Sequence, residues 1–240
     1  MSIFRTHTTT PPVVLNLIIA NVVVFLAMRF FGAEMIRFEL FPIDFRAGAM
    51  DYWHGIIDPL SSPIASQKHF SLWQPATYMF MHAGWAHLFF NMFSLWMFGR
   101  TLELELGWKR FLIYYVVCGV GAAIFQMGIA QIDLSHLEVG SGAWLRYMST
   151  PTVGASGAIF GLLLAFGMMH PNAIISLIFP PISMKAKWFV IVYGALELFL
   201  GVSEIVPGVA HFAHIGGMFW GWLLLVWWRS RDRKRNIYYY

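Results

Sequence analysis

The sequence is poor in charged side chains and has almost no cysteine. Asp, Glu, Lys and Arg make up 12% of its 240 residues, and hydrophobic residues make up 58%. Ordinary globular proteins are about a quarter charged, so the composition excludes a common soluble domain. Cys118 is the only cysteine, which excludes a disulfide framework and argues against a cysteine-based metal site.

The formal net charge of +4 does not mark a nucleic-acid-binding surface. The basic residues gather at the ends of apolar segments, as they do in membrane proteins that follow the positive-inside rule. We therefore expect a lipid bilayer around the chain and no nucleic-acid partner.

Long apolar stretches are abundant. Phe111–Ile132 and Ile205–Trp228 contain no Asp, Glu, Lys or Arg, and a helix needs about 20 mostly apolar residues to cross a bilayer. Tyr147–Met184 is also free of these residues, but its prolines leave room for one helix. The chain is predicted to be an all-α polytopic membrane protein with six transmembrane helices. They are expected at Val13–Phe31, Ala83–Thr101, Phe111–Ile132, Gly154–His170, Trp188–Ser203 and Val209–Trp228.

These helices are expected to form one membrane domain over residues 13–229, after a short N-terminal segment (1–12) and before a basic tail (230–240). The N-terminal segment lacks the pattern of a cleavable signal, so the first apolar segment is expected to stay as a helix. The aromatic-rich stretch Gly32–Gln74 is expected to lie at the lipid headgroups. Gly99–Arg110 is expected to be a charged turn, and residues 133–153 a polar loop.

Lysine and arginine are distributed unequally between the two sides of this bundle. One side holds eleven of the 16: Arg5, Arg100, Lys109, Arg110, Lys185, Lys187 and five between Arg229 and Arg235. The other side holds five: Arg29, Arg37, Arg46, Lys68 and Arg146. Both termini are therefore expected to be cytoplasmic, in a membrane that we expect to be the cytoplasmic (inner) membrane of a prokaryote.

Polar residues then lie near the outer start of the second, fourth and sixth predicted helices. They are His82, His87 and Asn91 in or just before the second, Ser156 in the fourth, and His211 and His214 in the sixth. Polar groups in hydrocarbon are costly and must find one another or water. Their shared depth predicts one common site.

A serine and a histidine in this set suggest nucleophilic catalysis. Ser156 lies in Gly154-Ala155-Ser156-Gly157, and His214 lies in Ala213-His214-Ile215-Gly216-Gly217. A serine hydroxyl becomes an effective nucleophile when a nearby histidine takes its proton. Either motif alone means little, because small residues at Gly157 and Gly161 also fit simple helix packing.

Together with the spacing H-x-x-x-N from His87 to Asn91, these motifs resemble the rhomboid intramembrane serine proteases. The resemblance implies that Ser156 is the nucleophile and His214 the general base, in a dyad without a third acid. It also implies an oxyanion hole formed by His87, Asn91 and the Ser156 N–H, with neither cofactor nor metal. These donors suit the negative charge of a tetrahedral intermediate.

Two packing expectations accompany the resemblance. The ring of Phe160, one turn beyond Ser156, could hold the His214 imidazole in place of an acid. Gly217 and Gly221 share a face with His214, so the sixth helix could approach the fourth closely.

Gly99, Glu103 and Gly107 match a further spacing common in the family.

The resemblance implies that the substrates are other membrane proteins, cut in or near the outer part of a transmembrane segment. One departure concerns the loop before the second helix. Where the family commonly has a Trp-Arg pair, Trp73 is followed by Gln74, which brings no charge and no five-donor fork. The anchoring of the loop is expected to differ.

Two other functions stay open. The first is a catalytically silent rhomboid-like protein that binds membrane helices without cutting them. The second is a metal or ion site built from His82, His87, His211 and His214. His82 is interpreted as either a supporting donor or a residue bonded to loop backbone, and His211 as an interfacial residue. Glu197 receives no role beyond a hydrogen bond to a neighbouring helix.

Overall fold

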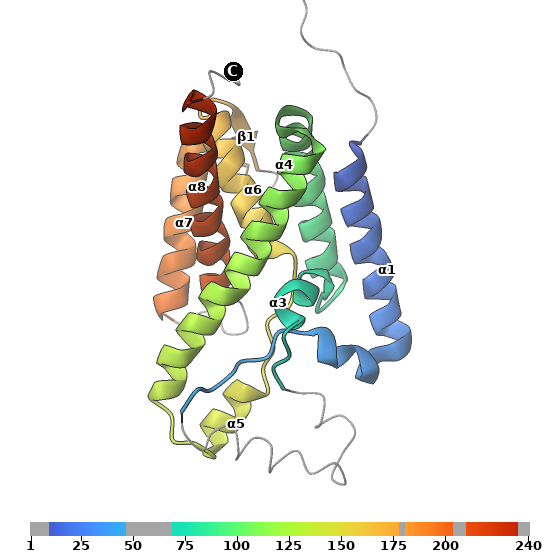
Figure 1. Cartoon of the computed structure of the whole chain (residues 1–240), viewed down its shortest axis with the longest axis vertical. Coiled ribbons are helices and arrows are strands. Elements are labelled where there is room, and N and C mark those ends of the chain that lie inside the picture. The colour runs from blue at the N-terminus through green and yellow to red at the C-terminus, as the bar shows by residue number, and fades with distance from the viewer. Residues whose placement is uncertain (1–9, 47–68, 178–180, 204–209, 235–240) are drawn as a thin grey trace, which may run out of the picture.

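The computed structural model describes residues 10–46, 69–177, 181–203 and 210–234. Its elements are α1 (Pro12–Met35), η1 (Ile36–Phe38), α3 (Gln74–Thr77), η3 (Tyr78–Phe80), α4 (Trp85–Ser135), α5 (Gly142–Met148), α6 (Ser156–Met169), β1 (Ile174–Ser176), β2 (Ser183–Lys185), α7 (Ala186–Ser203) and α8 (His211–Lys234). Figure 1 shows α1, α4, α6, α7 and α8 side by side as a bundle. The predicted start of the last helix, Val209, and the middle of the predicted interfacial stretch lie outside the described residues.

The second and third predicted helices are the two halves of α4. Gly107 separates them with φ 75° and ψ 155°, in the region that glycine adopts far more readily than other residues. The prediction of a charged turn over the whole of Gly99–Arg110 is therefore wrong. The helix continues on both sides of Gly107, and the break is confined to this residue. The break lies at the end of the bundle where α1 starts and α8 ends (Figure 1).

Glu103 lies inside the bundle rather than in a charged turn. Its side chain is 3% exposed, and its two oxygens accept hydrogen bonds from the backbone N–H groups of Val13 (3.0 Å) and Val14 (2.8 Å). Pro12 starts α1 without a side-chain cap of its own. The carboxylate therefore satisfies N–H groups that have no partner within the helix, at its positive end. Gly99, one turn earlier, lies against the side chain of Val14.

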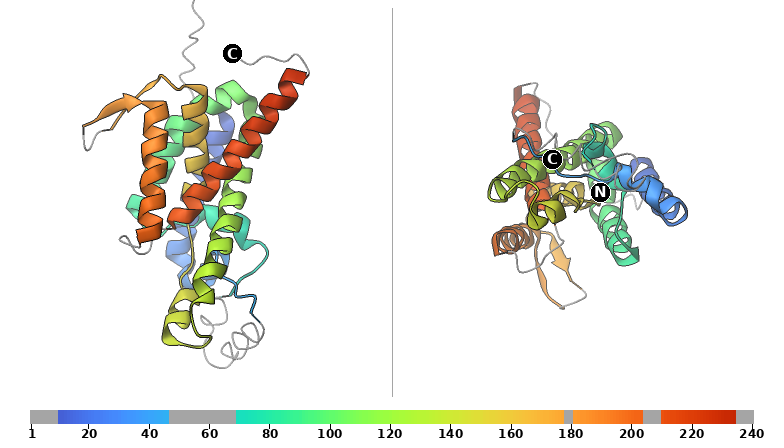
Figure 2. Two further views of the ribbon diagram at one scale, coloured as in Figure 1. Left: turned by 90° about the vertical axis from the view of Figure 1, so that its left-hand side faces the viewer. Right: turned by 90° about the horizontal axis from the view of Figure 1, so that it is seen from below.

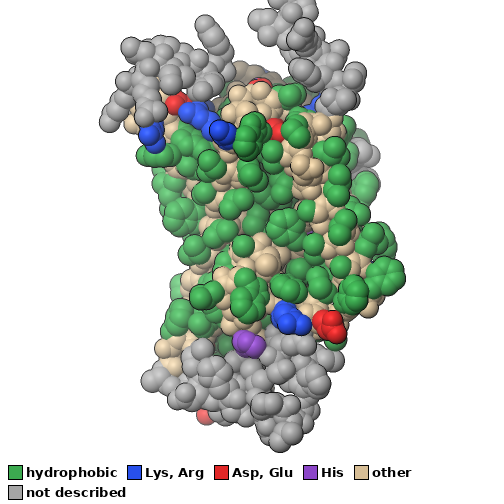
Figure 3. Space-filling model, turned by 45° about the vertical axis from the view of Figure 1, so that its right-hand side comes forward, with side chains coloured by type: hydrophobic (Ala, Val, Ile, Leu, Met, Phe, Trp, Pro, Cys, Tyr) green, Lys and Arg blue, Asp and Glu red, His purple; other side chains and the backbone are tan. Residues whose placement is uncertain are grey.

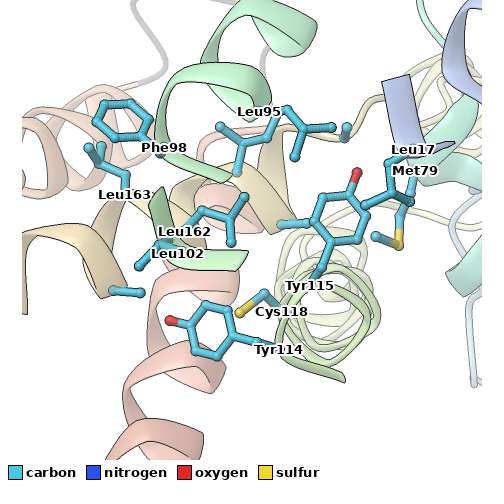
Figure 4. Packing of buried hydrophobic residues seen from close by; sticks show 14 of the residues in the cluster. Leu17, Met79, Leu95, Phe98, Leu102, Tyr114, Tyr115, Cys118, Leu162 and Leu163 are labelled. Carbon is cyan, nitrogen blue, oxygen red and sulfur yellow. The ribbon is translucent and has the colours of Figure 1, made fainter. Parts of the chain in front are cut away.

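The innermost helix is α6, in which every residue from Gly157 to Leu163 is buried. Its neighbours supply hydrogen bonds as well as apolar contacts. The Tyr114 hydroxyl of α4 donates to the carbonyl oxygen of Gly161 at 2.8 Å. Figure 4 shows this part of the core, where Tyr114 and Cys118 lie beside Leu162.

Glycines bring α8 against α6. A methyl group on Gly217 would lie 1.8 Å from the carbonyl oxygen of Gly157, so only hydrogen fits there. This confirms the expected close approach at Gly217. Gly221 serves another contact, because a methyl group there would meet the Tyr114 hydroxyl and Cys118 of α4.

The outer surface of the bundle is largely apolar. Pro12–Phe38, Trp85–Ser135 and Ala186–Ser203 are the described helical segments that are long and apolar enough to cross a membrane, and Ser156–Met169 is a shorter apolar helix. Figure 3 shows hydrophobic side chains over the middle of one face, with Lys and Arg toward the two ends. This pattern fits a membrane protein whose middle part is surrounded by lipid.

Several described elements were not predicted from the sequence. The expected polar loop contains α5, whose Ser141 N-cap accepts from the Trp144 N–H at 3.2 Å. Strands β1 and β2 form an antiparallel hairpin that connects α6 to α7 and projects outward from the bundle (Figure 2). The last helix continues to Lys234, so the first residues of the expected tail are helical.

The segment after η1 is fixed to α5. Asp44 is buried and accepts hydrogen bonds from the Arg46 guanidinium and from Trp144 Nε1 at 2.8 Å. Arg46 also donates to the carbonyl oxygen of Leu137 at 2.6 Å. Burial alone would raise the pKa of Asp44, but the hydrogen bonds from Arg46 and Trp144 outweigh it and lower the pKa to about 2.

Candidate active site

Ser156 and His214 meet between two helices. Ser156 is the first residue of α6, and His214 lies in the first turn of α8. The Ser156 Oγ is 2.8 Å from His214 Nε2, within hydrogen-bonding distance. The contact is possible because Gly217, one turn beyond His214, lets the helix backbones touch.

The imidazole of His214 is held on its face by an aromatic ring. The rings of Phe160 and His214 are stacked, with centroids 4.2 Å apart and an interplanar angle of 7°. The expected packing of Phe160 against the histidine is confirmed. Tyr193 of α7 continues the stack, with its ring 5.5 Å from that of Phe160.

A carboxylate contacts the other nitrogen of His214, so the expectation that no acid accompanies this histidine is wrong. Glu197 Oε2 of α7 is 2.9 Å from His214 Nδ1 and 2.6 Å from His211 Nδ1. Glu197 is 7% exposed and His211 6%, which also overturns the interfacial interpretation of His211. Glu197 is the only charged residue of the sequence between Trp188 and Ser203. A single charged residue in an apolar helix was the sequence signal that could have marked Glu197 as functional. It does not specify which residue the carboxylate contacts.

His87 and Asn91 lie next to the loop that carries Ser156. A methyl group on Gly154 would be 2.8 Å from the His87 ring and 3.7 Å from Asn91 Nδ2. Gly154 has φ 122°, and its N–H donates to the carbonyl oxygen of Tyr78 at 3.0 Å. Both its backbone angle and its surroundings therefore require glycine.

Both polar side chains keep a donor available. The His87 Nδ1 accepts from the Ala83 N–H at 3.4 Å, which leaves the proton of the neutral ring on Nε2. The Asn91 Nδ2 is buried and has no hydrogen-bond partner among the described residues. An unpaired buried amide is costly and calls for an explanation, which makes Asn91 a candidate for a role in the site.

A cavity of about 530 Å³ opens beside Ser156 and His214. Its wall includes His87 and Gly157 next to the serine, and Met127 and Tyr147 farther away. Residues 150–153 form another side, where Leu40 and Thr152 exchange backbone hydrogen bonds of 3.1 and 2.8 Å. The volume lies within the usual range for ligand sites.

The remaining polar candidates have structural partners. Gln74 is fully buried: its amide donates to the carbonyl oxygens of Arg37 and His69, and its oxygen accepts from the Phe41 N–H. It thus anchors the loop with three neutral hydrogen bonds. The His82 Nδ1 donates to the Phe80 carbonyl oxygen at 3.3 Å, which supports the loop-backbone interpretation.

The four histidines of the metal-site alternative do not form one ligand set. Within the described part of the chain, Glu197, His211 and His214 are the one group of three ligating side chains whose atoms lie within 4.8 Å of one another. His82 and His87 lie against each other instead, with ring centroids 5.0 Å apart. This distribution leaves Ser156 beside a hydrogen-bonded acid–base group rather than beside four imidazoles.

Comparison with known proteins identifies the family of this chain. The family model described as Rhomboid domain matches residues 69–231, more than half of the chain. The chain belongs to the rhomboid family. The matched range includes Ser156, His214, His87, Asn91 and Glu197.

Among its rhomboid relatives is "RHOMBOID-like protein 4" of Arabidopsis thaliana, 35% identical over 63% of this chain and 33% of the relative. "Rhomboid protease AarA" of Providencia stuartii is 27% identical over 64% of this chain and 55% of its own length. "Rhomboid protein 1, mitochondrial" of Saccharomyces cerevisiae is 29% identical over 66% of this chain and 43% of its own length. The chain therefore spans between a third and just over half of the length of these relatives. It shares their membrane-embedded rhomboid domain.

Proposed function

We propose that this rhomboid protein is an intramembrane serine endopeptidase with Ser156 as nucleophile and His214 as general base. The observation that carries the proposal is the 2.8 Å contact between Ser156 Oγ and His214 Nε2 on two apolar helices. A catalytically silent rhomboid-like protein is the other candidate, and it has no need for this contact. The relative named as a rhomboid protease supports the active alternative.

The reaction proceeds in two halves. His214 Nε2 takes the Ser156 hydroxyl proton as Oγ attacks the scissile carbonyl carbon, and the same nitrogen then gives the proton to the leaving amine. Water next attacks the acyl group on Ser156, with His214 again as base, and releases the second product. Polar side chains beside the 530 Å³ cavity offer water a route to the serine.

The negative charge of each tetrahedral intermediate is stabilised by His87 Nε2, Asn91 Nδ2 and the Ser156 N–H. The first two lie beside Gly154, two residues before the nucleophile. The Ser156 N–H starts α6, where N–H groups lack partners within the helix and the helix dipole is positive. Fixed donors of this kind contribute strongly to catalysis because they need no reorganisation during the reaction.

A membrane topology is part of this proposal. We propose six transmembrane helices in one membrane domain over residues 13–229, namely α1, the two halves of α4, α6, α7 and α8. Residues 1–12 and 230–240 flank it, and both termini face the cytoplasmic side. Lysine and arginine favour this orientation, by eleven to five. The relatives include bacterial and mitochondrial proteins, so the prokaryotic inner membrane stays a prediction.

The substrates are proposed to be single-pass or polytopic membrane proteins, cut in or near the outer part of a transmembrane segment. Ser156 and His214 lie at the starts of α6 and α8, close to one face of the membrane. A substrate helix shields its carbonyl groups by hydrogen bonding, so it must unwind before it is cut. Glycine or proline in its outer part therefore favours cleavage.

Labelling by a serine-directed fluorophosphonate tests this function. The detergent-solubilised wild type should be labelled at Ser156, and Ser156→Ala should abolish the labelling. Ser149→Ala, at the C-terminal end of α5, is the matched control and should label like the wild type. A folded wild type that resists the reagent would favour the catalytically silent alternative.

A further inference from the structure

Glu197 lies where a third member of a serine–histidine–acid arrangement would stand. Its Oε2 atom is 2.9 Å from His214 Nδ1, and His214 Nε2 is 2.8 Å from Ser156 Oγ. The acid comes from α7, the histidine from α8 and the serine from α6. No motif in the sequence joins these three residues.

We propose that Glu197 is a positioning residue that sets the proton of His214 on Nδ1, and that His211 holds Glu197 in place for this task. The inference rests on the proposed role of Ser156 and His214, and it adds the residues that set the protonation of His214. It also replaces the expected two-residue arrangement with a chain of four side chains.

The hydrogen-bonding capacity of the groups carries the inference. An ionised carboxylate only accepts hydrogen bonds, so both imidazoles must donate to Glu197 Oε2 through Nδ1–H. The neutral His214 ring then has a lone pair on Nε2, directed at the serine hydroxyl. This is the tautomer that a general base requires.

His211 holds the Glu197 carboxylate in place and does not take part in the reaction itself. Its Nδ1 is 2.6 Å from the carboxylate oxygen, whereas its Nε2 is buried with no partner among the described residues. The rings of His211 and His214 are nearly perpendicular, at 88°, with centroids 6.3 Å apart. Two donors from one helix therefore restrain one acceptor on its neighbour.

Simple attachment of α7 to α8 is the competing explanation. It accounts for a hydrogen bond between the helices, but it does not require the bonded nitrogen to belong to the histidine that contacts Ser156. A carboxylate among apolar helices is costly to bury and usually serves a function. The two explanations differ in what they predict for the chemistry of Ser156.

The groups around His214 define the background for a pH experiment. Ser156 faces it from α6, Glu197 from α7 and His211 from α8, and His87 of α4 lines the same cavity. Tyr193 lies one helical turn before Glu197 on α7. Because Ser156 labelling requires neutral His214, its rate reports the state of this cluster.

The experiment measures the rate of fluorophosphonate labelling from pH 5 to pH 9 in wild type, Glu197→Gln, Glu197→Asp and His211→Gln. Glu197→Gln should lower the rate by about 10²–10⁴-fold, since loss of the orienting acid in serine proteases costs up to about 10⁴. Its acid limb should move to lower pH, because a neutral amide stabilises an imidazolium less than a carboxylate does. Glu197→Asp should restore part of the rate, and His211→Gln should cost up to about tenfold.

Glu105→Gln is the matched control. Glu105 also pairs with a histidine, His170 at 3.0 Å. His170 lies at the other end of α6 from Ser156, about 20 Å away at 1.5 Å per residue. The control should keep the wild-type rate and pH profile. A folded Glu197→Gln that behaves like this control would overturn the inference.

A second measurement separates this inference from the proposed function. The ¹⁵N resonances of His214, assigned by comparison with His214→Gln, identify the protonated nitrogen without any activity. A proton on Nδ1 in the wild type, and a mixture of tautomers in Glu197→Gln, supports the inference even if Ser156 is never labelled. A proton on Nε2 in the wild type would refute the inference. This test needs only the wild type, so it holds even if Glu197→Gln fails to fold.

Discussion

Gly217 of α8 lies directly against the backbone of Gly157 in α6. The 1.8 Å separation that a methyl carbon would have from the Gly157 carbonyl oxygen is far shorter than any non-bonded contact between a carbon and an oxygen atom. Because the obstacle is backbone, no side chain can rotate away to relieve it. The Ser156–His214 contact depends on this approach, since the two residues lie within a turn of the glycine pair.

Gly217→Ala should therefore separate α6 from α8. We expect a loss of about 1–3 kcal/mol or more in stability, and a larger loss of Ser156 labelling than the unfolded fraction explains. Gly128→Ala is the control, because nothing lies within 4 Å of a methyl group there. Thermal unfolding and fluorophosphonate labelling measure the two effects. Equal behaviour of the two variants would show that the close approach is unnecessary.

Ser156→Ala and His214→Ala should each abolish proteolysis, because each removes a reacting group. Ser156→Ala should leave folding nearly intact, whereas His214→Ala also removes the ring that stacks on Phe160 and contacts the buried Glu197, so activity is compared per folded molecule. The double variant should be no worse than the single ones, as for residues that act as a unit. Cleavage of a membrane-protein substrate, followed by mass spectrometry, measures activity and locates the cut. Near-wild-type cleavage by either single variant would refute the assignment, and a cut in the inner half of the substrate helix would refute the proposed depth.

Asn91→Ala should slow turnover by up to about 10²–10³-fold with little change in KM, as expected for one lost oxyanion donor. His87→Ala should be comparable or milder. Asn21→Ala is the control: Asn21 is equally an amide buried in the bundle, but its Nδ2 donates to the Leu17 carbonyl oxygen within α1. If Asn91 has only a structural role, the two asparagine variants will both lower the unfolding temperature and keep turnover per folded molecule.

Glu103→Ala should destabilise the protein by about 0.5–2 kcal/mol, the usual range for a lost helix cap. Two N–H groups at the start of α1 lose their partner in this variant. Turnover per folded molecule should not change, because α1 contributes no residue to the site. Glu105→Ala, on a more exposed side chain of the same helix, should be nearly neutral. A loss of turnover without a loss of stability in Glu103→Ala would contradict this account.

Asp44 should make stability depend on pH in the acid range. Its folded-state pKa of about 2 lies below the ordinary value of 3.8, so its contribution is fully present above about pH 4 and is lost as pH falls toward 2. Asp44→Asn should lower the unfolding temperature at pH 6, and the difference from wild type should shrink between about pH 4 and pH 2. A difference that is constant over this range would show that the Asp44 charge is not stabilising.

Composition and local motifs were enough to predict the long apolar helices and to suggest Ser156 and His214 as catalytic candidates. Phe111–Ile132 contains no charged residue, and a stretch of this kind must form helix in a membrane because its backbone has no other partners there. Ser156 and His214 could be paired in advance because each lies in a glycine-rich motif at the start of an apolar segment. The stacking of Phe160 on His214 followed from the helical repeat.

The other residues that support this pair could not be predicted, because they come from other helices. Glu197 reaches His214 because of the rotation of α7 against α8, and no spacing within one helix defines that rotation. Glu103 caps α1 across 90 residues of sequence from Val13, although its charged neighbours suggested an exposed turn. Local sequence fixes the hydrogen bonds within a helix, whereas contacts between helices depend on the packing of all the side chains between them.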